Sequence, residues 1–170
     1  DFRLGQVFDA PADATGHQEP GVCPLPNGSY IAFARTITGN QWTTCSFDPL
    51  AFPPFQPDAA FPSPRSPMCI KPLHDGRYIA IFNPVPCDPA DDKYRFLGGR
   101  RAPLGYKLSE DGYRWSELKL LETDLDRGYC YTAVLSDNDE FVLLGYCAGG
   151  DEDGLCLNRQ RIVRLTLDEL

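Results

Sequence analysis

The chain repeats one pattern of apolar and polar positions three times. In each copy an apolar segment is followed by a short polar turn and by a second apolar segment, and the copies span residues 22–33, 69–82 and 133–144. The first two turns are Asn27-Gly28 and Asp75-Gly76. Such dipeptides tolerate the positive φ that a tight hairpin needs, and they are the strongest short-range hairpin signal. The pattern therefore predicts β-hairpins in an all-β protein.

The spacing of the turns indicates how the hairpins are combined. Gly28 and Gly76 are 48 residues apart, and the weaker turn at Asn138-Asp139 ends 63 residues after Gly76. All-β repeats of about 40–50 residues are typical of propeller blades with insertions. We therefore expect a single partial β-propeller domain over residues 1–170, with about three four-stranded antiparallel blades. The blades are expected at about 19–60, 66–121 and 129–170.

A second motif recurs within the repeats and reads Ser-x-Asp-x-x-x-aromatic. It occurs at 109–115, with Gly112 and Trp115, and in a degenerate form at 46–52, with Pro49 in place of the glycine. Serine and aspartate side chains in such a turn accept hydrogen bonds from nearby backbone amides, and glycine supplies the open dihedral angle. The motif predicts a structural turn that holds a blade together.

Prolines and chain ends suggest a part of a larger assembly. Prolines crowd the segment 48–67, which we expect to connect two blades and not to form a central strand. The chain begins at Asp1 without a methionine or a signal sequence, as a processed or cut piece would. Three blades do not close a ring of about 4–8 blades. We expect either a missing N-terminal half or a second copy to close the propeller.

Charge and cysteine content exclude several classes of function. The net charge of −8, without a basic run, argues against nucleic-acid and anionic-membrane partners, and no apolar run reaches transmembrane length. None of the seven cysteines lies in a CxxC pair, so we expect no metal site. Cys23, Cys69 and Cys130 fall at similar places in three strands, where cysteine acts as a small core hydrophobe.

Polar and aromatic side chains gather at equivalent ends of the predicted strands, where propellers place their central pocket. Glu19 precedes the first strand, Arg35 follows the second, and Arg101 enters a strand of the second repeat. Tyr129 and Tyr131 open the third repeat, and strand alternation predicts that both lie on one face. Arginine is suited to bidentate recognition of carboxylates. The sequence therefore predicts a pocket for an acidic ligand.

In these motifs the chain resembles the sialidase family, whose propellers carry Asp-box repeats. The matching residues follow the family's order over nearly the whole chain: Glu19-Pro20, Pro26-Asn27-Gly28 to Ala34-Arg35, Arg101-Ala102-Pro103-Leu104 leading into Ser109-Glu110-Asp111-Gly112 and Trp115, and Gly128-Tyr129-Cys130-Tyr131. The resemblance is to the C-terminal half of a six-bladed propeller. It implies an exo-acting, retaining glycoside hydrolase that removes terminal sialic acid, or a similar acidic sugar, from glycans.

The resemblance also implies roles for individual residues. Arg35 and Arg101 would be the second and third members of an arginine triad that binds the substrate carboxylate. Tyr129 would be the nucleophile and Glu19 its general base, an exception to the two-carboxylate scheme of most glycosidases. Tyr131 would contact substrate and is a rival for the nucleophile. The family's first triad arginine and its acid/base aspartate have no convincing match in this chain.

The sequence leaves two other functions open. One is a non-catalytic glycan-binding propeller, and the other is a propeller hydrolase or lyase for uronic-acid polysaccharides, whose carboxylates arginines would also recognise. For a sialidase-type enzyme we expect a glycan or acidic-sugar partner, no cofactor, and an extracellular or periplasmic location.

Overall fold

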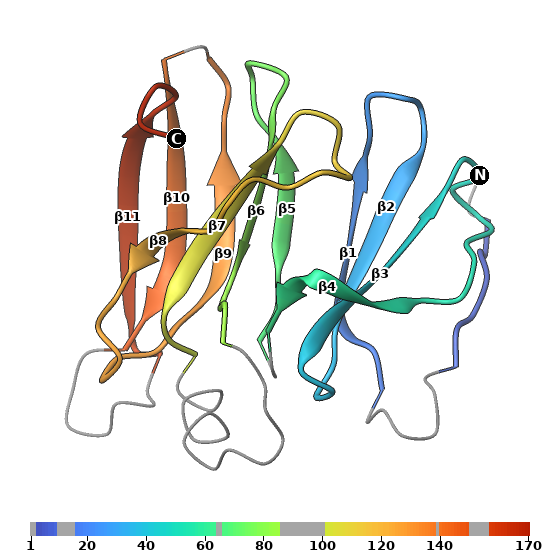
Figure 1. The fold of residues 1–170 in the computed structure, drawn as a ribbon, viewed down its shortest axis with the longest axis horizontal. Coiled ribbons are helices and arrows are strands. Elements are labelled where there is room, and N and C mark those ends of the chain that lie inside the picture. The colour runs from blue at the N-terminus through green and yellow to red at the C-terminus, as the bar shows by residue number, and fades with distance from the viewer. Residues whose placement is uncertain (1–2, 10–15, 64–65, 86–100, 139, 150–156) are drawn as a thin grey trace.

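The fold is all-β and consists of three antiparallel sheets, which confirms the fold class predicted from the hairpin repeats (Figure 1). Each sheet holds one copy of the repeated hairpin and corresponds to one predicted blade. No segment of the described part of the chain forms a helix that is long and apolar enough to span a membrane. The computed structural model describes residues 3–9, 16–63, 66–85, 101–138, 140–149 and 157–170.

The first blade is a four-stranded sheet with its strands in sequence order. Its strands are β1 (Gln18–Pro24), β2 (Tyr30–Arg35), β3 (Asn40–Ser46) and β4 (Gln56–Pro62). Strand β4 lies within the proline-rich segment that we expected to be a connection only. It forms an outer edge strand, the position in a sheet where proline is tolerated because one side of the strand needs no hydrogen-bond donors.

The second blade has four strands in sequence order, and the third has three, in the order β11-β10-β9. The second contains β5 (Cys69–Pro72), β6 (Tyr78–Phe82), β7 (Leu104–Ser109) and β8 (Lys119–Glu122). The third contains β9 (Tyr129–Leu135), β10 (Phe141–Ala148) and β11 (Arg159–Thr166). The third blade thus has three strands among its described residues.

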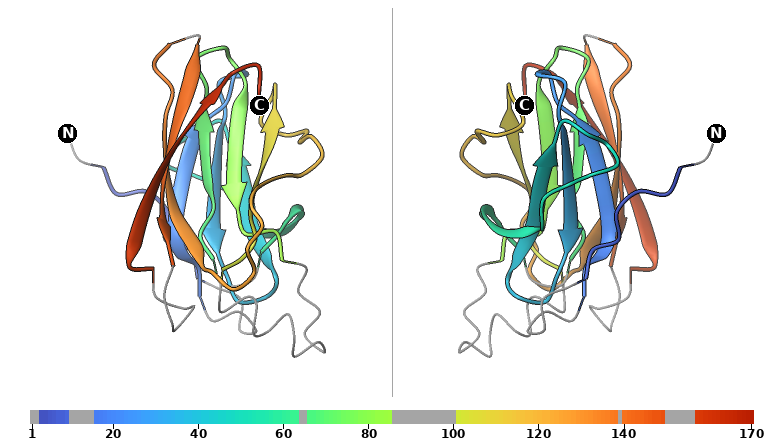
Figure 2. Two further views of the ribbon diagram at one scale, coloured as in Figure 1. Left: turned by 90° about the vertical axis from the view of Figure 1, so that its left-hand side faces the viewer. Right: turned by 90° about the vertical axis from the view of Figure 1, so that its right-hand side faces the viewer.

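The first strands of the three sheets lie next to one another. Strand β5 contacts β1 on one side and β9 on the other, as the inner strands of neighbouring propeller blades do (Figure 1). In side view the three sheets lie one behind another (Figure 2). Residues at equivalent ends of β1, β5 and β9 are therefore brought together from three separate parts of the sequence.

Apolar side chains fill the spaces between neighbouring blades. Ile79 and Ile81 of the second blade pack with Val142 and Leu144 of the third, and all four are at most 1% exposed. Between the first and second blades, Phe61 contacts Phe82 and Trp115 with edge-on rings. Burial of these apolar surfaces is the main stabilising contribution, so the stability of each blade depends on its neighbour.

The Asp-box turn of the second blade joins that blade to the first. Ser109 Oγ accepts a hydrogen bond from the Gly112 amide at 2.8 Å, and Asp111 Oδ1 accepts one from the Tyr113 amide at 2.8 Å. The Tyr113 hydroxyl lies 2.6 Å from Ser29 Oγ in the hairpin of the first blade. The motif therefore has the structural role predicted for it and also bridges two blades.

Candidate active site at the ends of the inner strands

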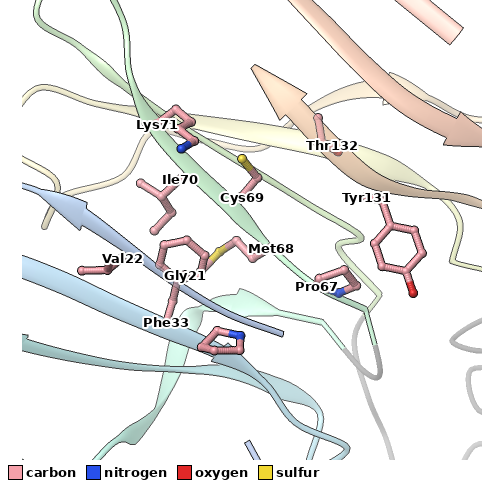
Figure 3. Close-up of a pocket in the computed structure, with 11 residues that line it drawn as sticks. Gly21, Val22, Phe33, Pro67, Met68, Cys69, Ile70, Lys71, Tyr131 and Thr132 are labelled. Atoms are coloured by element: carbon pink, nitrogen blue, oxygen red, sulfur yellow. The ribbon is translucent and has the colours of Figure 1, made fainter. Parts of the chain in front are cut away.

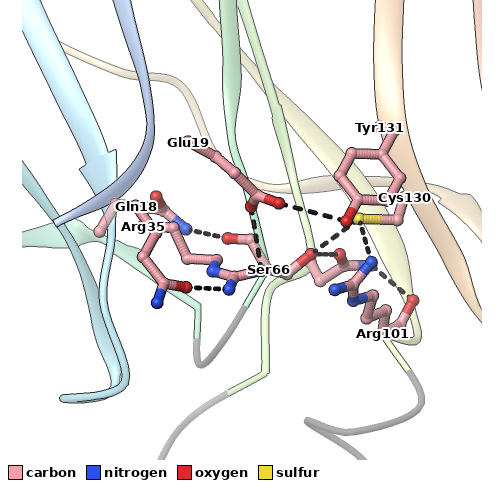
Figure 4. Close-up of polar contacts among 9 residues, drawn as sticks. Gln18, Glu19, Arg35, Ser66, Arg101, Cys130 and Tyr131 are labelled. Atoms are coloured by element: carbon pink, nitrogen blue, oxygen red, sulfur yellow. Dashed lines mark hydrogen bonds and ion pairs between the residues drawn. The ribbon is translucent and has the colours of Figure 1, made fainter. Parts of the chain in front are cut away.

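A carboxylate from the first blade contacts a phenol from the third. The Tyr131 hydroxyl donates a hydrogen bond to Glu19 Oε1 at 3.2 Å, although 112 residues separate the two in sequence (Figure 4). The other oxygen of Glu19, Oε2, lies 3.0 Å from Arg35 Nη1. Glu19 thus links a tyrosine and an arginine, an arrangement in which a carboxylate can accept the phenol proton.

Arg101 completes a group of four of the predicted site residues. Its guanidinium carbon lies 5.0 Å from the centre of the Tyr131 ring, within the range of a cation–π contact. Its Nη1 donates a hydrogen bond to Cys130 Sγ at 3.1 Å. Burial opposes the charged form, but the nearby Cys130, Tyr131 and Glu19 outweigh it and raise the pKa of Arg101. The site therefore contains a firmly charged guanidinium beside the exposed phenol.

Three of these residues have an unusual backbone conformation. Glu19, Arg101 and Tyr131 have φ angles of 47°, 55° and 56°, and the described part of the chain contains no other non-glycine residue with positive φ. L-residues adopt this region only where the surrounding structure imposes it, and such residues cluster at functional sites. Among the described residues, positive φ at non-glycine positions therefore occurs only in this group of site residues.

A β-bulge in strand β1 places Glu19. Gln18 pairs with Arg35 and Gly21 pairs with Phe33. Between these two pairs β1 therefore contains one residue more than β2. The extra residue lies between these pairs, where Glu19 has its positive φ. Bulges of this kind re-aim a side chain that regular alternation would direct elsewhere.

A second bulge places Tyr131 in the same way. Cys130 pairs with Cys147 and Ala133 pairs with Gly145, so β9 also carries one residue more than its partner β10. Tyr131 lies within the bulge and has positive φ. The inner strands of the first and third blades therefore use the same device at the same end.

The bulge separates the two candidate tyrosines. Tyr129 is 1% exposed and packs against Tyr146, with ring centres 6.3 Å apart, whereas Tyr131 is 48% exposed. Burial, with the nearby Glu122 and Asp124, raises the pKa of Tyr129. The expectation that both tyrosines share a face is wrong, because the extra residue interrupts alternation. Tyr129 as the nucleophile stays a prediction, and no described contact links its side chain to Glu19.

Sequence reasoning missed several residues that support this group. Arg35 Nη2 donates a hydrogen bond to Gln18 Oε1, and Ser66 Oγ donates one to Asn83 Oδ1 (Figure 4). Asn83 directly follows the apolar strand β6, and Arg35 is the last residue of the apolar strand β2, so a polar residue at the end of an apolar segment is the signal that could have found Asn83. The described residues include no group of His, Cys, Asp or Glu side chains that could hold a metal ion.

A pocket of about 390 Å³ lies beside Tyr131, along the inner strands (Figure 3). Pro20, Phe33 and Met68 give it an apolar wall, and Lys71 is its charged side chain. Tyr131 stands at one end of the pocket in Figure 3. Of the four residues that meet at the site, Tyr131 lines this pocket, whereas Glu19, Arg35 and Arg101 do not.

Residues 4–145 match the family described as the BNR repeat-like domain. The chain belongs to this family. Membership confirms the resemblance inferred from the motifs, at the level of a BNR-repeat, sialidase-like fold. A comparison with curated proteins finds no match.

Proposed function

We propose that this BNR repeat-like domain carries the nucleophile and the carboxylate-binding part of a retaining, exo-acting glycosidase site of sialidase type. The observation that supports it most is the contact of Glu19 with both Tyr131 and Arg35, across two blades. A base, a nucleophile and a cation held together in this way match the chemistry of a tyrosine-dependent glycosidase.

In this proposal Tyr131, and not Tyr129, is the nucleophile. Its hydroxyl already donates to Glu19 and its side chain is half-exposed, whereas Tyr129 is buried in the apolar core. The Tyr131 oxygen would bond to the anomeric carbon while the bond from that carbon to the leaving oxygen breaks, and the phenol proton would pass to Glu19. Water would then hydrolyse the glycosyl-tyrosine, which gives retained configuration.

The substrate class follows from the two arginines. Arg101 lies over the Tyr131 ring and Arg35 contacts Glu19, the hydrogen-bond partner of Tyr131. A substrate carboxylate bound to the two arginines would lie beside the reacting carbon, as it does in a sugar with an anomeric carboxylate. A neutral phenol approaches such a centre without the charge repulsion that a carboxylate nucleophile would meet. We therefore propose terminal sialic acid, or a similar acidic sugar on a glycan, as the substrate.

The proposal requires groups from outside the described residues. A general acid must protonate the leaving oxygen, and a further arginine would complete the carboxylate site. We propose that additional blades, from the rest of the propeller or from a second copy, supply them where the ring closes. A glycan substrate of this kind fits an extracellular or periplasmic location.

Hydrolysis of a fluorogenic sialoside by the propeller with its full set of blades tests the proposal. Tyr131→Phe is expected to lower kcat by at least about 10²-fold, since it removes the attacking oxygen. Tyr129→Phe is the matched control and is expected to retain turnover. Loss of turnover in Tyr129→Phe alone would return the nucleophile to that residue. Sialoside binding by a folded wild type without any turnover would overturn the proposal of an enzyme and favour a glycan-binding function.

A further inference from the structure

Asn83, directly after β6, contacts the backbone of two of the three segments that carry strained site residues, those of Arg101 and Tyr131. Its side chain is buried, with 1% of the residue exposed. The Nδ2 amide donates hydrogen bonds to the carbonyl oxygens of Arg101 at 2.6 Å, Pro103 at 2.8 Å and Tyr129 at 3.1 Å. An amide carries two hydrogens, so one of them is shared between two carbonyls. One side chain thus joins the start of β7 to the start of β9.

The same two segments are also joined directly. The Tyr129 amide donates to the Arg101 carbonyl at 2.9 Å, so this carbonyl accepts from both Tyr129 and Asn83. Arg101 itself has positive φ, and Tyr131 with its positive φ lies two residues beyond Tyr129. The hydrogen bonds therefore act on the backbone where the strain is located, and they offset the cost of holding it.

The oxygen of the Asn83 amide continues the network toward the arginine side chain. Asn83 Oδ1 accepts from Ser66 Oγ, which lies 3.5 Å from Cys130 Sγ. Cys130 Sγ in turn accepts from Arg101 Nη1 at 3.1 Å. The Ser66 carbonyl accepts from Gln41 Nε2 at 2.5 Å, which extends the network into the first blade. Asn83 is thus connected to both the backbone and the guanidinium of Arg101.

We infer that Asn83 is a positioning residue that sets the geometry of Arg101 and Tyr131 without touching the substrate. This inference rests on the proposed function for its effect on turnover, but the placement of Tyr131 can be measured separately. Asparagine is suited to the task because it donates to the carbonyls and accepts from Ser66 with one planar group. An apolar replacement would leave one buried and two part-buried carbonyls with fewer donors, and the two segments would move apart.

Asn83→Ala tests the inference, with Ser109→Ala as the matched control. Ser109 is also a buried polar residue of the second blade, with 4% exposed, but it lies at the other end of β7. Two readouts are compared in folded protein: the ¹³Cζ chemical shift of Tyr131, assigned through its loss in Tyr131→Phe, and kcat with KM on the fluorogenic sialoside. A merely structural role would affect both variants alike.

Asn83→Ala is expected to shift the Tyr131 resonance and to raise KM, because Arg101 is displaced. It is also expected to lower kcat/KM by about 10²-fold, which is the cost of misplacing reacting groups by about 1 Å. Ser109→Ala is expected to leave the resonance, kcat and KM of the folded protein unchanged. A folded Asn83→Ala with the wild-type resonance, or with the same changes as Ser109→Ala, would overturn the inference. If the wild type lacks turnover, the resonance alone decides it.

Ser66→Ala keeps the test decisive if Asn83→Ala does not fold. It removes the hydrogen bond to Asn83 Oδ1 and leaves the three carbonyl contacts in place. Arg101→Lys removes the packing of the guanidinium on Tyr131 and gives the direction of the expected shift. In Ser66→Ala the Tyr131 resonance is expected to move in the same direction as in Arg101→Lys, but by less. An unmoved resonance in folded Ser66→Ala, together with an unfolded Asn83→Ala, would make Asn83 a purely structural residue.

Discussion

Glu19 and Tyr131 each occupy a β-bulge in the inner strand of their blade, and their side chains meet through a 3.2 Å hydrogen bond. Both have positive φ. Two non-glycine residues in this conformation, each at the same irregularity and in contact, indicate that the bulges serve the contact between the side chains. The catalytic proposal depends on this pair more than on any single residue.

The charge of Glu19 is the first property to test. Glu19→Gln retains the shape of the side chain but removes the base, so kcat on the sialoside should fall by about 10²–10⁴-fold, while affinity for the substrate stays largely intact. Glu117→Gln, which changes an exposed carboxylate in the second blade, is the control for net charge. Equal effects of the two substitutions on kcat would contradict a general-base role for Glu19.

The bulge of β1 depends on Gly21. A Cβ placed there would come within 2.2 Å of the Phe33 ring, so Gly21→Ala must displace either the ring or the strand that carries Glu19. We expect a loss of about 1–3 kcal/mol in the free energy of unfolding, measured by urea denaturation, with reduced turnover. Gly145→Ala is the matched control, since its Cβ meets nothing within 4 Å. Similar stability losses in both variants would argue against the steric explanation.

The Asp-box carboxylate should make stability depend on pH. Hydrogen bonds from the amides of Arg114 and Tyr113 lower the pKa of Asp111 below its ordinary value of 3.8. A folded-state pKa below the unfolded value stabilises the protein at neutral pH, and this contribution is lost as the pH falls through the folded pKa. Asp111→Asn should therefore be less stable than wild type at pH 7, and urea denaturation should show the difference narrowing in acid. A constant difference would contradict this account.

The buried thiols should be unreactive in the native protein. Burial raises the pKa of Cys23 to about 11, and burial also raises the pKa of Cys130, so little thiolate is present at pH 8. Both residues are 1% exposed. A colorimetric thiol reagent should label neither within minutes, until guanidinium chloride unfolds the chain. Cys23→Ala should leave the native labelling amplitude unchanged and reduce only the denatured one. A smaller native amplitude in that variant would show that Cys23 is accessible.

Local signals in the sequence were sufficient for the hairpins. Gly28 and Gly76 have φ angles of 85° and 89°, the positive values that the sequence predicted for glycine in these two turns. The proline-rich β4 was not predicted, because its prolines argue against a strand everywhere except at an outer edge, and edge position is set by tertiary packing. The third turn includes Asp139, which lies outside the described residues.

The sequence predicted which strand ends lie together, but not how the side chains are arranged there. Glu19, Arg35 and Arg101 do meet at one end of the blades, because repeated blades bring equivalent strand ends together. Strand alternation predicted that Tyr129 and Tyr131 share a face, and it fails here because β9 carries a bulge, which is set by the register with the neighbouring strand β10. That register is a property of the paired strands and not of the local sequence.

The position of β5 between β1 and β9 limits how this family member can change by gain or loss of repeats. The proposed base, Glu19, and the proposed nucleophile, Tyr131, reach each other across the width of one intervening blade. An additional blade inserted between them would move the two side chains apart, and removal of the second blade would take Arg101 with it. The proposed reaction would therefore fix the number of blades in this stretch of the propeller.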